Sequence, residues 1–204
     1  MPKIVDHGER RAELAEAVWR LASREGLEAL TVRRVAAEAG WSTGALVHYF
    51  SDKEELLLFA FETTADRVGR RMAAAAERLT DPLELVRACL LEGLPLDAER
   101  RAEVRVWFTF LGLALTRPRL ARAQRDAYRL WRGKLAADLR SAQEQGRIAA
   151  DVDCDGEAAA LVALADGLAV QASFEPRAMP SERQVAIVDA RLARFRGAPE
   201  PAKR

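Results

Sequence analysis

The sequence predicts an all-α protein in which a small three-helix unit is joined by a long helix to a larger helical body. Apolar residues recur at helical spacing along most of the chain, and no strand pattern stands out. Half of the residues are apolar but only 6% are aromatic, and Ala, Leu, Arg and Glu dominate, which favours helices over strands. With 204 residues, the chain can bury one core and a small satellite domain.

The first helix is expected from about Glu9 to Glu25, because Leu14, Val18 and Leu21 recur at helical spacing and a glycine follows.

Two short helices are then expected across a break at Gly40, which is placed to take the left-handed conformation that ends a helix. Thr31 stands where the N-cap of the first should be, and Ser42 can cap the second, which we expect to reach Phe50. Such a pair forms a helix-turn-helix, whose second helix can enter the major groove of DNA. The alternative is an ordinary helical hairpin buried in a bundle.

A long helix should begin at a capping box with Ser51 as N-cap and Glu54 at the third helical position, and should end near Leu79. Lys53 lies in its first turn, where backbone N–H groups and the helix dipole also favour a phosphate.

The rest of the chain predicts further helices separated by proline, glycine or polar connections. One of them is apolar almost all round and should be buried on several sides. In chain order the helices are 82–94, 98–116, 118–145, 157–174 (the apolar one) and a last one containing 185–192; a tail from Gly197 to Arg204 is expected to be disordered.

Charge, cysteine and histidine usage restrict the possible functions. The net charge of +1 does not indicate nucleic-acid binding, and acids outnumber bases in the first sixty residues; the distribution matters more, since Arg33, Arg34 and Lys53 flank the second short helix.

Cys89 and Cys154 are expected to be reduced thiols. The two histidines stand at no metal-ligand spacing from them, so we expect no metal and no cofactor. No apolar run approaches the ~18 residues of a membrane span and no signal-peptide core is evident, which favours a cytoplasmic protein without a membrane partner.

Four stretches of the N-terminal part carry a recognisable pattern: Ala29-Leu30-Thr31-Val32-Arg33-Arg34-Val35-Ala36-Ala37-Glu38-Ala39-Gly40, Ser42-Thr43-Gly44-Ala45-Leu46, His48-Tyr49-Phe50 and Asp52-Lys53-Glu54-Glu55-Leu56-Leu57. With these residues the chain resembles the TetR family of transcriptional regulators over roughly Gly8 to Arg67. The family usually carries a tyrosine where this chain has Val47, and in this respect the chain is similar to the BetI-like branch. The run Leu164-Ala165-Asp166-Gly167-Leu168 is similar to the effector domain of that branch.

The resemblance implies a helix-turn-helix DNA-binding domain at 8–67, a helical effector-binding and dimerisation domain at 68–197 and a tail at 198–204. It implies a homodimer that binds double-stranded operator DNA as a repressor and is released by a small organic effector, of mainly apolar or cationic character. An activator, or a helical ligand-binding protein without DNA binding, remains an alternative. No nucleophile–base pair is evident, so we do not expect an enzyme.

The expected DNA contacts follow from the faces of the two short helices. Arg33 is the candidate for a bidentate guanine contact, with a solvated surface ion pair as its alternative. Thr43 can bond a base edge or a phosphate, and the Val47 methyls could meet a thymine methyl. The resemblance places His48 and Tyr49 on backbone phosphates. The full expected set is Thr31, Arg33, Ser42, Thr43, Gly44, Val47, His48, Tyr49 and Lys53.

The body offers candidate residues for an effector pocket, although core packing explains each aromatic one equally well. Asp166 stands in an apolar helix and needs a partner, which could be a cationic effector, an internal polar network or a second subunit. The candidate pocket residues are Cys89, Trp107, Phe108, Phe110, Leu111, Tyr128, Trp131 and Asp166.

The last two long helices carry small residues that suit close packing against a second copy. The candidate interface residues are Leu161, Leu164, Gly167, Leu168, Val188 and Leu192.

Overall fold

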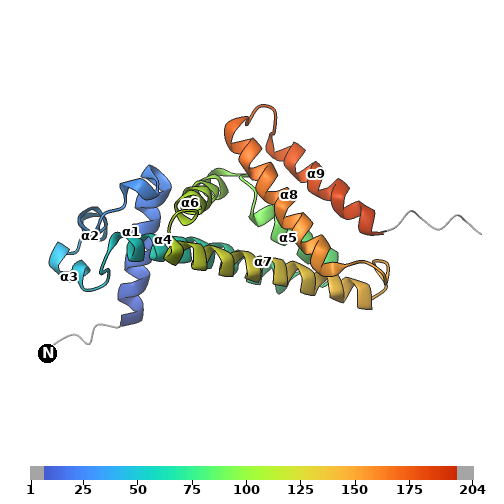
Figure 1. Cartoon of the computed structure of the whole chain (residues 1–204), viewed down its shortest axis with the longest axis horizontal. Coiled ribbons are helices and arrows are strands. Elements are labelled where there is room, and N and C mark those ends of the chain that lie inside the picture. The colour runs from blue at the N-terminus through green and yellow to red at the C-terminus, as the bar shows by residue number, and fades with distance from the viewer. Residues whose placement is uncertain (1–6, 197–204) are drawn as a thin grey trace, which may run out of the picture. The chain divides into compact units, whose positions relative to one another are not determined.

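The computed structural model describes residues 7–196, and every regular element in that range is helical (Figure 1). The tail from Gly197 on, predicted to be disordered, lies outside the described residues. The α-helices are α1 His7–Glu25, α2 Val32–Ala39, α3 Thr43–Val47, α4 Lys53–Ala76, α5 Pro82–Glu92, α6 Ala98–Ala114, α7 Pro118–Glu144, α8 Cys154–Phe174 and α9 Ser181–Ala193, with 3₁₀ turns η1 Leu27–Ala29 and η2 Arg194–Arg196. The all-α fold class is therefore confirmed.

The described residues pack as two compact units. The first contains the residues up to Arg67 together with Ala102–Gln124, and the second contains Val68–Arg101 and the residues from Arg125 on. Helices α4, α6 and α7 each contribute residues to both units. The sequence-derived bounds of 8–67 and 68–197 remain predictions.

The turn between α2 and α3 forms as the sequence predicts. The Thr31 hydroxyl oxygen accepts the Arg34 N–H at 3.2 Å, and that of Ser42 accepts the Ala45 N–H at 3.2 Å, so both residues are N-caps. Gly40 has φ 71°, in the left-handed region where a side chain would be strained. Its conformation ends α2 and turns the chain into α3.

Helix α3 is shorter than expected, because it ends at Val47 rather than at Phe50. The Tyr49 N–H still bonds to the Leu46 carbonyl at 2.9 Å, but the chain then leaves the helix. Phe50 is buried, and its ring meets that of Phe59 edge-on at 5.3 Å. Packing of this ring in the core outweighs one further helical turn.

The capping box of α4 lies one residue later than predicted. Asp52 is the cap: its Oδ1 accepts the Glu55 N–H at 2.8 Å, while Glu55 Oε2 accepts the Ser51 N–H at 2.7 Å. The pairing of Ser51 with Glu54 is therefore wrong. The sequence offers two overlapping boxes, and the aspartate, which is also a strong N-cap, takes the role.

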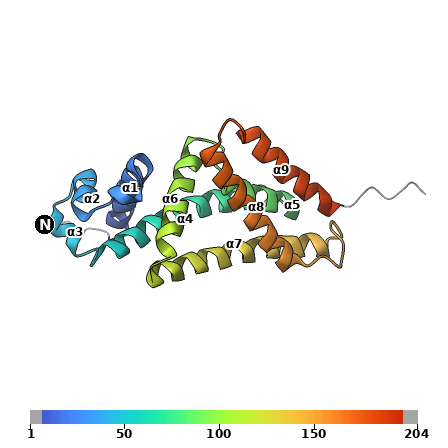
Figure 2. The same cartoon turned by 45° about the horizontal axis from the view of Figure 1, so that its top comes forward.

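Helix α8 begins at Cys154, earlier than the expected Glu157, because Asp153 caps it by accepting the Gly156 N–H at 3.1 Å. Figures 1 and 2 show α8 and α9 side by side, and both also contact α5. By length and composition alone, α8 would be able to cross a membrane, although a core helix of a water-soluble protein passes the same test.

Each unit has its own core. In the first, Leu14, Val35 and Leu46 are fully buried, and the Phe61 and Phe110 rings stack at 4.0 Å. In the second, the buried side chains come mainly from α5, α7, α8 and α9: Val86, Leu90, Leu135, Leu139, Leu161, Leu168, Val188 and Leu192.

The cap of α4 leads to a stability prediction. Asp52→Ala should lower the melting temperature at pH 7 by roughly 2–4 °C, as expected for a lost N-cap in a chain of this size, whereas Asp52→Asn should keep most of the cap. The Glu55 N–H lowers the pKa of Asp52 below its ordinary 3.8, so the stabilisation is present above that value and is lost as the pH falls through the lowered pKa. Thermal unfolding followed by circular dichroism at several pH values measures it. An Asp52→Ala protein that melts with the wild type at pH 7 would contradict this cap.

Candidate nucleic-acid interface

The position of α3 is fixed by its turn and by the core beneath it. The Trp41 N–H bonds to the Ala36 carbonyl at 2.9 Å across the Gly40 turn. Leu46 is fully buried on the inner side of α3, as the amphipathic pattern predicts. One face of α3 is thus held in the unit, and the opposite face remains available.

The available face carries residues expected to contact DNA. Thr43, Gly44 and His48 are exposed, and Val47 is 55% exposed, although it is apolar. A Cβ added at Gly44 would meet no atom within 4 Å, so this position faces open space. Without a side chain there, a ligand can approach the backbone closely. The arrangement suits contact with base edges in a major groove.

The residues expected around this face keep polar groups for DNA. The Thr31 and Ser42 oxygens each accept a backbone N–H, and their hydroxyl hydrogens remain able to donate to a phosphate. Arg33 and Lys53 are exposed, the latter as the first residue of α4.

The cations of residues 7–67 fall into two groups. Most are paired with carboxylates of the same unit: Arg11 with Glu62, Arg20 and Arg24 with Glu38, Arg34 with Glu25 and Arg67 with Glu16. Hydrogen bonds from Arg24 and then Arg20 lower the pKa of Glu38, so it stays ionised at neutral pH.

Three cations of the same stretch, Arg10, Arg33 and Lys53, form no ion pair with any carboxylate in residues 7–196. The acids that outnumber the bases here are therefore partly neutralised by other arginines. The positive charge left unpaired comes from the start of α1, the start of α2 and the start of α4.

A hollow of about 370 Å³ lies beside α3, lined by Arg10, Trp41, Ser42, Ala45, His48 and Tyr49. The rings of Trp41 and Tyr49 have centroids 5.7 Å apart, and the guanidinium of Arg10 lies 5.8 Å from the Trp41 ring centroid. Tyr49 is therefore half-buried by a neighbour rather than fully exposed. Arg10 and Trp41 are not among the expected site residues. Trp41 lies in the turn itself, whereas Arg10 reaches the hollow only because α1 packs against α2.

The eight residues expected to line an effector pocket lie in both units. In the first, Phe110 is fully buried and the Trp107 ring stacks on Phe61 at 5.4 Å, as in ordinary core packing. Phe108 and Leu111 are half-buried on the same helix. None of these four residues lines the hollow beside α3.

In the second unit, Tyr128 donates a 2.6 Å hydrogen bond to Asp166 Oδ2, which supplies a partner for the carboxylate in the apolar helix α8. The Trp131 indole packs so closely on Gly93 that a Cβ there would lie 2.9 Å from the ring. Burial raises the pKa of the Cys89 thiol to about 12, although a hydrogen bond with Trp131 opposes the shift. Cys89 is therefore a protonated, buried thiol.

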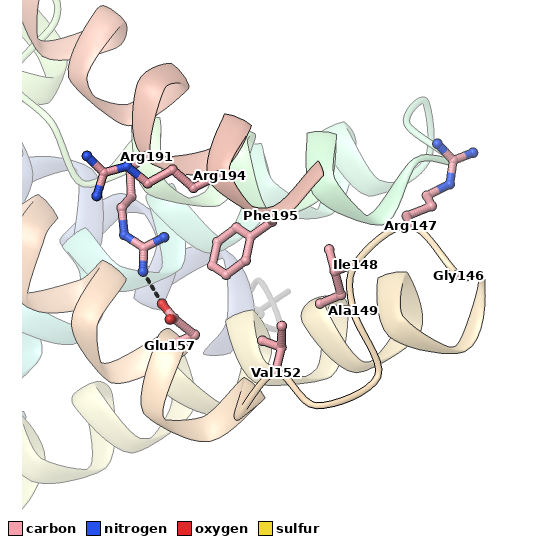
Figure 3. A pocket seen from close by; sticks show the side chains of 9 residues that line it. All are labelled: Gly146, Arg147, Ile148, Ala149, Val152, Glu157, Arg191, Arg194 and Phe195. Carbon is pink, nitrogen blue, oxygen red and sulfur yellow. Dashed lines mark hydrogen bonds and ion pairs between the residues drawn. The ribbon is translucent and has the colours of Figure 1, made fainter. Parts of the chain in front are cut away.

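A pocket of about 600 Å³ lies in the second unit where the α7–α8 loop meets α9 (Figure 3). Its lining contains none of the eight expected effector residues. Arg191 pairs with Glu157 and lies over the Phe195 ring at 4.8 Å, and Arg147 pairs with Asp81 at 2.9 Å. In Figure 3 the side chains of Arg147 and Arg194 point away from the space between Phe195 and Ile148. The charges around this pocket do not converge on a ligand.

The expected interface residues divide into two classes. Leu161, Leu168, Val188 and Leu192 are buried within the single chain, because α8 and α9 pack on each other and on α5. Leu164 and Gly167 are half-buried. No other segment of residues 7–196 covers the opposite face of α8, where Val170 is 39% and Phe174 83% exposed.

Comparison with known proteins gives matches along almost the whole chain. Residues 14–59 match the profile described as "Bacterial regulatory proteins, tetR family", and residues 82–197 match that described as "BetI-type transcriptional repressor, C-terminal". The HTH-type transcriptional regulator PksA of Bacillus subtilis is 38% identical over 183 residues, which cover 90% of this chain and 88% of the relative. The regulator BetI 1 of Chromohalobacter salexigens is 29% identical, over 90% of this chain and 88% of its own.

Two solved structures are similar in both fold and sequence. A transcriptional regulator from Rhodococcus sp. Rha1 superimposes with a TM-score of 0.77 at 34% identity and covers 91% of this chain and 95% of its own. A putative transcriptional regulator from Saccharomonospora viridis, solved in complex with choline, gives a TM-score of 0.79 at 27% identity, over 90% of this chain and 95% of its own.

Proposed function

The chain belongs to the TetR family of transcriptional regulators, and we propose that it is a repressor that binds operator DNA as a homodimer and is released by a small organic effector. The observation that carries the proposal is the exposed face of α3 beside three cations with no carboxylate partner in residues 7–196. We propose that it works in the cytoplasm, where it can reach DNA.

On DNA, the face of α3 and the start of α2 read bases, and the surrounding residues hold the backbone. Arg33 binds a guanine edge, while Thr43 and Val47 meet base edges where Gly44 permits close approach. The residues assigned to backbone phosphates are Thr31, Ser42, His48, Tyr49 and Lys53. Such contacts set the register of the protein and carry no sequence information directly.

The dimer is proposed to form through the uncovered face of α8 together with α9. Ala160, Ala163, Val170 and Phe174 are all exposed, lie at helical spacing and leave room for a close approach of two helices. On α9 the exposed side likewise carries small residues, among them Ala186, Ala190 and Ala193. We propose these exposed residues for the interface because a second copy can reach them, whereas the expected Leu161, Leu168, Val188 and Leu192 are buried within the single chain.

The effector is proposed to be a cationic organic molecule that binds in the second unit. Asp166 and Tyr128 form a half-buried polar pair, and Trp131 stands three residues from Tyr128 on α7, within reach of the same face. A carboxylate and aromatic rings are the groups that recognise quaternary ammonium ions. The choline complex of the Saccharomonospora viridis regulator supports this chemistry.

Release requires the effector to bind the DNA-competent and DNA-free conformations unequally. Helix α4 follows α3 in the chain and continues into the second unit, so, like α6 and α7, it is an element through which a change in one unit can reach the other. A change in the distance between the two α3 helices of the dimer would then lower the affinity for an operator with two half-sites.

DNA binding is tested by titrating the protein with a duplex selected from random sequence by the wild type. Tyr49→Ala should raise Kd about tenfold, because two hydrogen bonds per dimer are lost, and Kd of the wild type should rise steeply with salt. Tyr49→Phe keeps the ring against Trp41 and isolates the hydroxyl. A wild type that selects no DNA would favour the alternative of a helical ligand-binding protein.

The dimer assignment is tested with Phe174→Glu, which places charge on the uncovered face. Sedimentation should show a monomer, because burying an unpaired carboxylate in an apolar interface is costly. Leu130→Glu is the matched control: Leu130, on α7, is also strongly exposed, at 75%, but lies outside the proposed interface. If Phe174→Glu sediments as a dimer, the interface lies elsewhere.

The effector chemistry is tested by calorimetric titration with choline. Binding should weaken at least about tenfold in Asp166→Asn, which keeps the shape but removes the charge, and less in Tyr128→Phe. The absence of heat with wild-type protein, or an unchanged Kd in Asp166→Asn, would contradict a cationic effector at this carboxylate.

A further inference from the structure

We propose that the hollow beside α3 seats one sugar–phosphate unit of the DNA backbone and that Arg10, from the start of α1, is the cation that binds its phosphate. This inference rests on the proposed function, and adds to it a contact from a helix outside the helix-turn-helix.

The lining of the hollow combines apolar surface with a cation, as a sugar–phosphate unit requires. The apolar part consists of the Ala45 methyl and of the Trp41 and Tyr49 rings, which contact each other with their centroids 5.7 Å apart. These surfaces can pack against the carbon atoms of a deoxyribose. The polar groups of the lining are those of Arg10, Ser42 and His48, together with the Tyr49 hydroxyl.

Helix α3 thereby has two working faces. Ser42 caps α3, Ala45 lies on it and Tyr49 follows its end, and all three residues border the hollow. Thr43 and Val47 are four residues apart and share the neighbouring exposed face assigned to bases. A strand whose bases meet the second face would pass its backbone along the first.

Arg10 differs from the other arginines of α1 in what surrounds its charge. Arg11 pairs with Glu62 at 3.9 Å, Arg20 pairs with Glu38 at 2.9 Å, and Arg24 also pairs with Glu38. The guanidinium of Arg10 has no carboxylate partner in residues 7–196 and lies over the Trp41 ring at 5.8 Å. An indole face orients a guanidinium without neutralising it, so the charge and its hydrogen-bond donors remain for a phosphate.

The test compares Arg10→Ala, Arg10→Lys and Arg11→Ala with the wild type over 50–200 mM salt. Two probes are used: the selected duplex and a 30-base-pair duplex of random sequence. Each dimer would lose two phosphate contacts in Arg10→Ala, so the rise of its Kd across this salt range should be about tenfold smaller than that of the wild type. The reduction should appear with both probes, because a phosphate contact carries no sequence information.

The control variants separate charge from packing. Arg10→Lys should keep the salt dependence of the wild type, and Arg11→Ala should keep it because its guanidinium already has a partner. Melting temperatures of all variants show whether Arg10 matters only through its contact with Trp41.

Two results would overturn the inference, and they differ from each other. If the wild type binds DNA but Arg10→Ala keeps its salt dependence, whether or not its melting temperature falls, Arg10 is a packing residue and the proposed repressor stands. If the wild type binds neither duplex at 50 mM salt, the proposed function fails and this contact fails with it.

Discussion

The left-handed turn at Gly40 is the constraint on which the interface depends. Its φ of 71° ends α2, and the Trp41 N–H then bonds to the Ala36 carbonyl, which fixes the start of the turn into α3. Leu46 fills the core from that direction, which leaves Thr43 and Val47 on the outside. The same turn places Trp41 against Tyr49 and beside Arg10. One backbone conformation thus determines both the face for bases and the hollow for the backbone.

The ion pairs of the N-terminal unit say more about its ability to bind DNA than the net charge does. A net charge of +1 argues against nucleic-acid binding if it is taken alone. Carboxylates such as Glu38 and Glu25 are, however, paired with Arg20, Arg24 and Arg34 of the same unit. What a phosphate would meet is the remaining unpaired charge. A protein can therefore bind DNA with few excess cations if its acids are neutralised internally.

The sequence predicts local structure well and long-range packing poorly. The N-caps at Thr31 and Ser42 and the stop at Gly40 depend only on neighbouring residues, and all three are confirmed. The sequence places the cap of α4 one residue too early, since Ser51 and Asp52 both satisfy the local rule and the choice depends on Glu55. The role of Arg10, and the division of the expected pocket residues between two units, depend on contacts between distant segments, which no local pattern records.

The most direct measurement of the central claim is a hydroxyl-radical footprint of the wild-type protein on DNA that it has selected. A dimer that presents two α3 helices and two sets of backbone contacts should protect two windows, centred about one helical turn or a multiple of it apart and related by two-fold symmetry. Protection should be strongest at sugars next to the contacted phosphates. A single protected window, or uniform cleavage along the duplex, would contradict the account that α3 and its flanking cations form the DNA-binding face of a dimer.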